Sequence, residues 1–342
     1  GALADAALRR LADFDPQNCA NTVWSYASLV ICDLPLIDAI AARSISTISE
    51  FSCQSLANTA WAFANLELMD LPLLDAVSAQ ARVMLHELAT CGMRRHELIS
   101  FALGLLGIAW AHAFLSVAAG ELEPLLQRSL ARIGDEVGRQ DALLAAQDKA
   151  LPDLEPDATA GIASREPHID MHLRGMVVIH KQPDWEVDGK ARASGRREDA
   201  EEDLPPPLSA WLRTALPRSS CPVTRDAGLD HGFLHRLDVP SSGLILCGTT
   251  FPGLMSLRWQ LDTYRIERQY AVWGHGLAVP SLRSVTANID PREVASRRSF
   301  VSDARGKPAT TWFAVPAHLR TPPRREETAA AYGGCSAFLV RI

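Results

Sequence analysis

The chain has 342 residues, of which 47% are hydrophobic and 22% charged, and its formal net charge is −6. This length and composition fit two folded domains, and a mean hydropathy of zero indicates a soluble protein. Residues 1–150 carry 10 Lys+Arg against 17 Asp+Glu, and residues 151–342 carry 24 against 23. Neither half is a basic domain, so the first half is poorly suited to strong non-specific binding of nucleic acid.

The seven cysteines contain no Cys-x-x-Cys pair. This spacing makes a zinc ribbon or zinc finger unlikely to form and indicates reduced, mostly buried thiols of an intracellular protein. We therefore expect no metal site.

The first half contains an internal repeat with a period of 37 residues. A period of this length, with apolar residues at helical spacing, predicts paired helices stacked as a solenoid. A third, degraded copy is predicted near His96, where Leu98 and Ser100 echo Leu56 and Asn58. The residues that recur in the first copy are Phe14, Gln17, Ala20–Thr22, Trp24, Leu29, Leu34–Pro35 and Asp38–Ala39. Their counterparts in the second copy are Phe51, Gln54, Ala57–Thr59, Trp61, Leu66, Leu71–Pro72 and Asp75–Ala76.

The repeat unit Phe51–Ala64 resembles octotricopeptide-type repeats, which occur largely in organellar RNA-binding proteins of algae and other protists. The resemblance implies an RNA-binding module over residues 1–135 and a location in a chloroplast or mitochondrion. Helical-repeat RNA binders commonly read one base per unit, so these units would cover a few nucleotides. A solenoid that binds a protein partner, or is purely structural, stays open as the alternative.

The segment Leu98–Gly120 has no Asp, Glu, Lys or Arg over 23 residues, which is long enough to span a bilayer. Gly104, Gly107 and His112, in an alanine-rich stretch, equally suit a helix hairpin buried in a solenoid. We expect a charge-poor core helix, and no membrane as a partner.

Proline and charge mark two breaks in the second half of the chain. Residues 136–170, with Pro152, Pro156 and Pro167, predict a linker, and residues 171–342 predict a separate catalytic domain. Within that domain, residues 189–207 are polar and predict a flexible insertion.

The segment Phe233–Cys247 places His235, Arg236 and Asp238 between two apolar runs, followed by a Pro/Ser/Gly turn. Asp238 is thus expected where a strand becomes a loop, at a position that is both rigid and reachable. The arrangement is typical of an active-site lip. On the chemistry alone, a solvated strand end is also possible.

Three further segments accompany this motif: Met176–Trp185, Ile266–Gly274 and Gly306–Phe313. Together the four segments resemble RluA-like pseudouridine synthases over residues 171–342. The first is similar to the family's opening strand and Lys-Pro turn, although Gln182 stands at the usual first Pro position and Asp184 where Gly is common. These departures put the turn geometry in doubt.

The resemblance implies an α+β domain with a mainly antiparallel mixed sheet and flanking helices, acting on uridine in RNA. It implies that Asp238 is the essential carboxylate, either as nucleophile at C1′ or as base at C2′ of the ribose. Arg236 would fill the space that the flipped uridine leaves, and Tyr270 would lie against its ring. His235 is expected in an RNA-contact or packing role. Lys181 and Arg268 are expected to contact RNA, and no cofactor is required.

We therefore expect an isomerase whose repeats help to choose a tRNA, an rRNA or an organellar transcript, with a monomer favoured. The alternatives are a non-catalytic RNA-binding protein on a degenerate synthase fold and a helical-repeat scaffold for protein partners. The first residue is Gly and not Met, so we expect that the amino-terminal part of the protein, with any targeting peptide, is missing from this sequence. The last predicted strand ends at Ile342, before the family's Thr-Gly-Arg-x-His-Gln-x-Arg type motif, so we expect this chain to show little activity by itself.

Overall fold

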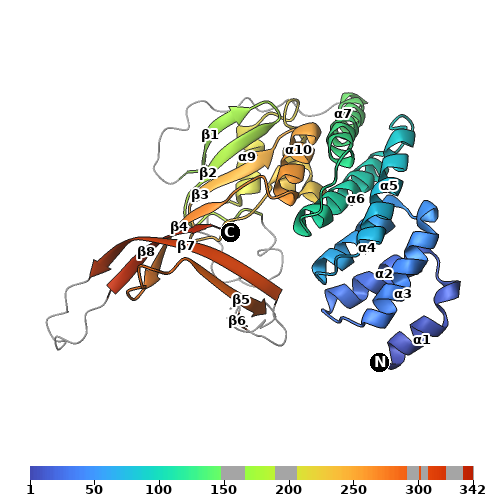
Figure 1. Ribbon diagram of the computed structural model, residues 1–342. Helices are drawn as coiled ribbons and strands as arrows, with labels where there is room; N and C mark the ends of the chain where they lie inside the picture. Colours follow the sequence, from blue (N-terminus) through green and yellow to red (C-terminus); the bar gives the residue numbers. More distant parts are fainter. Residues whose placement is uncertain (148–165, 189–205, 291–299, 302–306, 321–333, 342) are drawn as a thin grey trace, which may run out of the picture. The chain divides into compact units, whose positions relative to one another are not determined.

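The computed structural model describes residues 1–147, 166–188, 206–290, 300–301, 307–320 and 334–341. These residues form two compact units, 1–263 and 264–342, each of which is described by itself (Figure 1). The first unit is mainly helical and carries a small sheet, and the second is a sheet.

The amino-terminal part of the first unit consists of helices joined by short turns. Its longer helices begin at the predicted repeat spacing, since α2 and α4 start at Pro16 and Cys53 and α3 and α5 at Leu34 and Leu71. The helices are α1 (Ala2–Arg9), η1 (Leu11–Asp13), α2 (Pro16–Ser28), α3 (Leu34–Ser46), η2 (Ile48–Glu50), α4 (Cys53–Asn65), α5 (Leu71–Glu87), α6 (Arg95–Phe114) and α7 (Leu122–Gln147).

The capping residues of these helices repeat with the same period. The Asp15 carboxylate accepts the Asn18 amide at 2.7 Å, and 37 positions later the Ser52 hydroxyl accepts the Ser55 amide at 3.1 Å. Asp33 and Asp70 cap α3 and α5 in the same way. Because an N-cap acceptor satisfies an otherwise unpaired backbone N–H, these polar residues set where each helix begins.

Helices two apart in the chain lie side by side, with α4 between α2 and α6 (Figure 1). Glycines allow the closest approach: a Cβ on Gly104 would lie 2.7 Å from Cys53 Sγ, and one on Gly107 would lie 3.2 Å from Ala57 Cβ. Trp110 consequently lies beside Trp61, with ring centroids 6.5 Å apart. The predicted third copy near His96 stays a prediction.

Helix α6 is long and apolar enough to cross a membrane by length and composition, with half of its apolar window buried inside the structure. It contacts α4 and α7. His112 is buried on this helix, where its ring nitrogens lie 2.7 Å from Ser78 Oγ and 3.0 Å from the Ile108 carbonyl oxygen. Burial lowers the pKa of His112, and the charge of Asp75 opposes that shift weakly.

The rest of the first unit is a small α+β arrangement. Three antiparallel strands lie in the order β1-β2-β3, and α9 and α10 belong to the same unit. Val177 and Ile179 of β2 and Ile245 of β3 are fully buried in one core with Leu208 and Leu212 of α9. The elements are β1 (His168–Leu173), β2 (Met176–Lys181), α9 (Leu208–Ala215), η3 (Pro222–Arg225), η4 (Ala227–Gly232), β3 (Gly243–Gly248) and α10 (Phe251–Asp262).

One core joins the helices to this α+β part. Phe251 and Leu254 of α10 are buried in the same cluster as Ile133 and Val137 of α7. Those two α7 residues are one turn apart and face α10, so the helix continues through residue 135. Residues 136–147 are therefore helical where we predicted a linker.

The other predicted boundaries are only partly described. Residues 148–165 and 189–205 lie outside the described residues, and with them most of the predicted linker and of the polar insertion. The division into a repeat module and a catalytic domain stays a prediction.

The second unit is a five-stranded antiparallel sheet with the strand order β4-β8-β7-β5-β6. Helices together with antiparallel sheets confirm the α+β expectation at that level. Its strands are β4 (Gln269–His275), β5 (Ser284–Asp290), β6 (Phe300–Val301), β7 (Lys307–Arg320) and β8 (Gly334–Arg341).

Substitution of Gly134 by Ala is expected to destabilise the first unit. A Cβ at Gly134 would lie 2.7 Å from the backbone of Pro252, which has no flexible side chain to move away. Overpacking of this kind costs about 1–3 kcal/mol, more than the roughly 1 kcal/mol that replacing a helical Gly returns. Urea unfolding gives the free energy directly.

Gly138→Ala is the matched control on the same helix. A Cβ there meets only the Phe251 ring, at 3.8 Å, so this variant should be as stable as the parent or more so. Equal effects of the two substitutions would contradict close packing of α7 on α10.

Candidate functional site

The segment that carries Asp238 runs beside β3 before it turns. Phe233 pairs with Cys247, and the Leu234 amide donates to the Leu246 carbonyl at 3.0 Å. The Ser241 amide then donates to the Asp238 carbonyl at 3.0 Å, which closes the turn. Asp238 is exposed on this turn, in an irregular segment that follows an isolated bridge at Phe233 and not at the end of a strand.

Lys181 anchors the loop that contains Asp238 and Val239. Its side chain is 0% exposed, and its Nζ donates to the carbonyls of Gln182 at 3.0 Å and Val239 at 3.1 Å. The Asp184 amide donates to the same Val239 carbonyl at 2.7 Å. The residue that follows Asp238 is therefore anchored by two donors.

Burial lowers the pKa of Lys181, and attraction to Asp184 and Asp238 opposes that shift. A buried ammonium cannot also reach RNA, so the direct RNA contact predicted for Lys181 does not fit this geometry. We assign it a positioning role instead: it fixes Val239 and places a positive charge under the Asp238 loop.

The unusual residue Asp184 fits the turn. Its φ is +69°, in the left-handed region that glycine adopts most readily. Asp is among the few other residues that tolerate this conformation, because its short side chain can hydrogen-bond locally. The turn thus keeps a conformation suited to Gly although the sequence has Asp there.

The neighbouring motif residues differ in exposure. Arg236 has a 60% exposed side chain and its Nη1 lies 3.3 Å from Asp188, which is 11% exposed. Its guanidinium is thus attached at one side and open at the other. His235 is half-buried and its Nε2 accepts the Leu246 amide at 3.4 Å, a contact that favours packing against β3 over acid–base work.

Cys247 lies under the same segment, where burial raises the pKa of its thiol to about 12. A thiol with that pKa is uncharged near neutral pH, so Cys247 is a core residue and not a nucleophile.

Tyr270 and Arg268 lie in the second unit. Tyr270 is half-buried in β4 and pairs with Val340 of β8, and Arg268 directly precedes that strand. The predicted approach of Tyr270 to the uracil ring, and the RNA contact of Arg268, stay predictions. Among the described residues no group of three or more His, Cys, Asp or Glu is placed to hold a metal ion.

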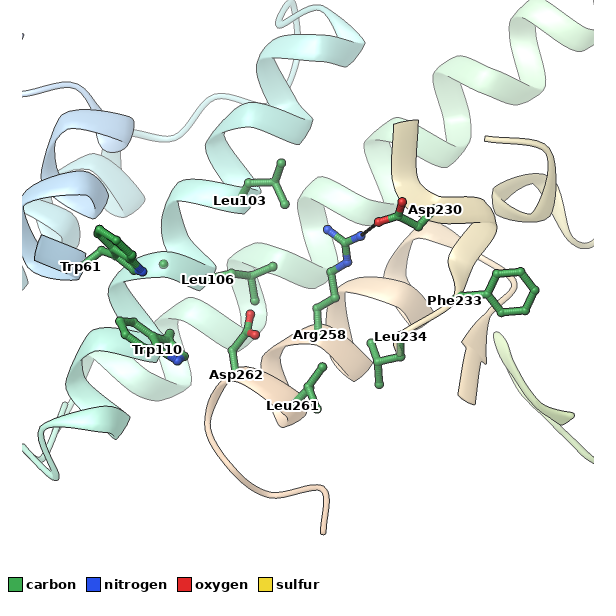
Figure 2. A pocket seen from close by; sticks show the side chains of 11 residues that line it. Trp61, Leu103, Leu106, Trp110, Asp230, Phe233, Leu234, Arg258, Leu261 and Asp262 are labelled. Atoms are coloured by element: carbon green, nitrogen blue, oxygen red, sulfur yellow. Dashed lines mark ion pairs between the residues drawn. The ribbon is translucent and has the colours of Figure 1, made fainter. Parts of the chain in front are cut away.

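A second concave region lies within the first unit, between α4 and α6 on one side and α10 on the other. Its volume is about 420 Å³, and Figure 2 shows Trp61 and Trp110 facing Arg258 and Asp262 across it. Arg258 forms an ion pair with Asp230 at 3.8 Å. The cavity is lined by Trp61, Leu103, Leu106, Gly107, Trp110, Asp230, Phe233, Leu234, Arg258, Leu261 and Asp262.

Asp262 is the most perturbed carboxyl of this cavity. Burial raises its pKa from 3.8 to about 6, although Arg258 pulls it down. The sequence does not predict this cavity, because nothing in the spacing of residues 61, 110 and 262 indicates that they line the same cavity. The only available signal was the recurrence of Trp at Trp24 and Trp61.

Substitution of Lys181 by Met is expected to loosen the Asp238 turn. The change keeps the length of the side chain and removes the donor to Val239, at a cost of about 1–3 kcal/mol. Hydrogen exchange should show the Ser241 amide exchanging about tenfold faster. The Ile179 amide, in the middle of the β2–β3 ladder, serves as the internal control. If the two amides respond equally, Lys181 is not a local anchor of the turn.

Substitution of Asp262 by Asn is expected to stabilise the protein above pH 6. The native carboxyl has a pKa raised by burial, so it contributes stability that is present below pH 3.8 and lost as the pH rises through about 6. Asn does not titrate. Its advantage over the parent should be below about 3 kcal/mol at pH 7.5 and disappear by about pH 4, as measured by urea unfolding at both pH values. A pH-independent difference would show that Asp262 titrates normally.

Comparison with known proteins gives one sequence match of note. The chain is 29% identical over 83 residues to ribosomal large subunit pseudouridine synthase C of Buchnera aphidicola subsp. Schizaphis graminum, a stretch that is 24% of this chain and 26% of that protein. The chain thus matches about a quarter of the length of this curated relative. No family model matches the chain.

Among solved structures, human RNA pseudouridylate synthase domain containing 4 aligns with 51% of this chain and 58% of its own, at 14% identity. The TM-score of 0.30 is too low for this likeness to carry an argument. Neither comparison bears on the helical repeats. The sequence match supports the resemblance predicted from the sequence, and over these 83 residues the chain is similar to a pseudouridine synthase.

Proposed function

We propose that this protein is an RNA pseudouridine synthase in which Asp238 is the reacting carboxylate. The observation that carries the proposal is the anchored and exposed position of Asp238, on a turn fixed by Ser241 and by buried Lys181. A carboxylate that must react with a ribose inside RNA has to be rigid and reachable at once.

The proposed reaction is an isomerisation. The bond between N1 of uracil and C1′ of the ribose breaks, the ring turns, and a bond forms between C5 and C1′ while the C5 proton leaves. Reactant and product have the same atoms, so no co-substrate is required. Asp238 can assist as nucleophile at C1′ or as base at C2′, and its exposure suits both roles.

Electrostatics support a reacting anion at this position. Lys181 lies close enough to Asp238 for their charges to attract, and Arg236 is two residues away in the chain. The ionised carboxylate is the reactive form in both roles. Because Lys181 is buried, solvent screens its charge less than it would at the surface.

Arg236 is proposed to enter the RNA when the uridine is flipped out. Flipping costs a few kcal/mol of unstacking, which a planar guanidinium can partly offset by stacking in the vacated space. The contact with Asp188 holds one edge of the guanidinium at 3.3 Å and leaves its exposed part available.

The helical repeats are proposed to form a short solenoid that helps to select the RNA. Support comes from the matched caps of α2–α5 and from the side-by-side packing of α2, α4 and α6. The substrate class, a tRNA, an rRNA or an organellar transcript, and the location in a chloroplast or mitochondrion belong to the same proposal. The repeats share a core with α10, so point substitutions test this idea more cleanly than deletion of residues 1–135.

Substitution of Asp238 by Asn is expected to abolish pseudouridine formation and to leave RNA binding nearly unchanged. The change removes the reacting oxygen anion and almost no volume. The measurement is pseudouridine mapping on total and organellar RNA from cells that carry the full-length parent, the variant or neither, with RNA affinity measured in parallel.

Asp38→Asn, an exposed carboxylate on α3, is the matched control and should behave like the parent. Pseudouridine at the parent level in the Asp238 variant would rule out the proposed catalytic role. RNA binding without any parent-dependent pseudouridine site would instead indicate a non-catalytic RNA-binding protein.

A further inference from the structure

Aromatic rings follow one another across the helices of the first unit. Ring centroids lie 6.1 Å apart for Trp24 and Trp61, 6.5 Å for Trp61 and Trp110, and 4.9 Å for Trp110 and Phe114, with interplanar angles of 29–36°. Trp24 is 45% exposed and Phe114 40%. Trp61 and Trp110, between these two exposed rings, are half-buried, so the four rings together leave an aromatic strip partly open to solvent that is suited to binding. We call these four side chains the aromatic row.

Uncharged polar side chains accompany the aromatic row. A smaller cavity of about 300 Å³ is lined by Trp24 and Trp61, and the polar side chains in its lining are those of Gln54, Asn58 and Ser100. Gln54, Asn58 and Trp61 occupy positions i, i+4 and i+7 of α4 and so share one face of the helix. Among the residues that the structure describes, no Asp, Glu, Lys or Arg lines this cavity. Its chemistry is aromatic and amide, which suits neutral planar groups.

The larger cavity continues from the other side of Trp61 and ends in charged groups. Trp61, Leu103 and Gly107 line both cavities, so the two share a wall. In Figure 2 Asp262 and Arg258 both come from α10; the Asp262 carboxylate lies on the side of the indole rings, and the Arg258 guanidinium points to Asp230. This end therefore offers an acceptor and donors beside a flat apolar wall.

Asp262 has hydrogen-bonding capacity to spare. Within the described part of the chain, no hydrogen bond or ion pair occupies its carboxylate, which feels only the charge of Arg258. Arg258 in turn has one ion pair there, to exposed Asp230 at 3.8 Å, and carries five N–H donors. A half-buried carboxylate with unused acceptors favours a ligand that brings N–H donors.

We propose that this cavity binds an unpaired guanine of single-stranded RNA, with neighbouring bases on the aromatic row. Guanine presents N1–H and N2–H₂ donors for Asp262 on one edge and the acceptors O6 and N7 for Arg258 on the next. Its flat rings stack on Trp61 and Trp110. The volume of about 420 Å³ is within the range of small-ligand sites, roughly 300–1,000 Å³.

The other bases match less well. Adenine and cytosine each offer a single amino group as donor and would leave an acceptor of Asp262 unpaired, and uracil offers only N3–H. A free guanine nucleotide has the same base, but it would leave the smaller cavity and Trp24 unoccupied. The continuity of two cavities along Trp61 therefore favours a strand of several nucleotides. This inference rests on the proposed function only in taking RNA as the partner.

The test measures affinity of the full chain for hexanucleotides, followed by quenching of tryptophan fluorescence. Four RNA strands of uridines carry G, A, C or U at the third position, and guanosine monophosphate is the free-nucleotide arm. The strand with G should bind about tenfold more tightly than the others and than the free nucleotide. Asp262→Asn should remove the preference for G, because its amide replaces an acceptor by a donor.

Two substitutions at Trp61 separate stacking from folding. Trp61→Leu should weaken binding of all strands about tenfold, the loss expected for one stacking ring, whereas Trp61→Phe keeps a ring and should retain most of the affinity. Asp135→Asn, an exposed carboxylate on α7, is the control for Asp262→Asn and should keep the preference for G. Circular dichroism identifies any variant that has not folded, and the folded ones decide the outcome.

Equal affinity for all four strands, or a preference for G that survives in Asp262→Asn, would overturn the guanine assignment. Equal affinity for the free nucleotide and for the strand would overturn the RNA assignment. These outcomes are independent of the reaction. If binding of the G strand depends on Trp61 and Asp262 but the protein forms no pseudouridine, the guanine site is supported and the proposed function fails. If the protein forms pseudouridine but shows no such binding, the guanine site fails and the proposed function is unaffected.

Discussion

Close packing of α7 on α10 is the constraint on which the rest of the first unit depends. Gly134 lets the helix approach the backbone of Pro252, and Ile133 and Val137 on the same helix fill the contact. Arg95 strengthens the junction, since its guanidinium bonds Asp141 at 2.8 Å, pairs with Asp226 and lies 5.3 Å from the centre of the Phe251 ring. Helices α6, α7 and α10 therefore share one core.

That junction also creates the larger cavity, which is lined by Trp61, Trp110 and Asp262. With α7 fixed against α10, helix α6 is held beside α10 as well, and the indole of Trp110 comes to face Asp262. Burial in this cavity raises the pKa of Asp262 to about 6. Burial of a charge without a hydrogen-bonded partner costs folding free energy, so this cavity is a place where stability and binding oppose each other.

Much of the fold could be predicted from the sequence because its signals are local. The 37-residue period, the caps Asp15 and Ser52 and the position of Asp238 after an apolar segment all depend on neighbours in the chain. Burial of Lys181 and the place of Trp110 could not be predicted, because both depend on which distant backbone lies opposite. A Lys before a turn is normally solvated, and only the Val239 carbonyl explains why this one is buried.

The acidic balance of the repeats and an RNA partner are compatible if affinity comes from bases and not from phosphates. Among the described residues, the smaller cavity beside Trp24 has no charged side chain in its lining. The lining of the larger cavity contains Arg258 and two carboxylates. Affinity that comes from stacking and from hydrogen bonds to base edges depends little on salt concentration. Affinity that comes from phosphate contacts falls steeply as the salt concentration rises. A surface of this kind would leave most RNA unbound and hold the strands whose bases fit, as the proposed role in RNA selection requires.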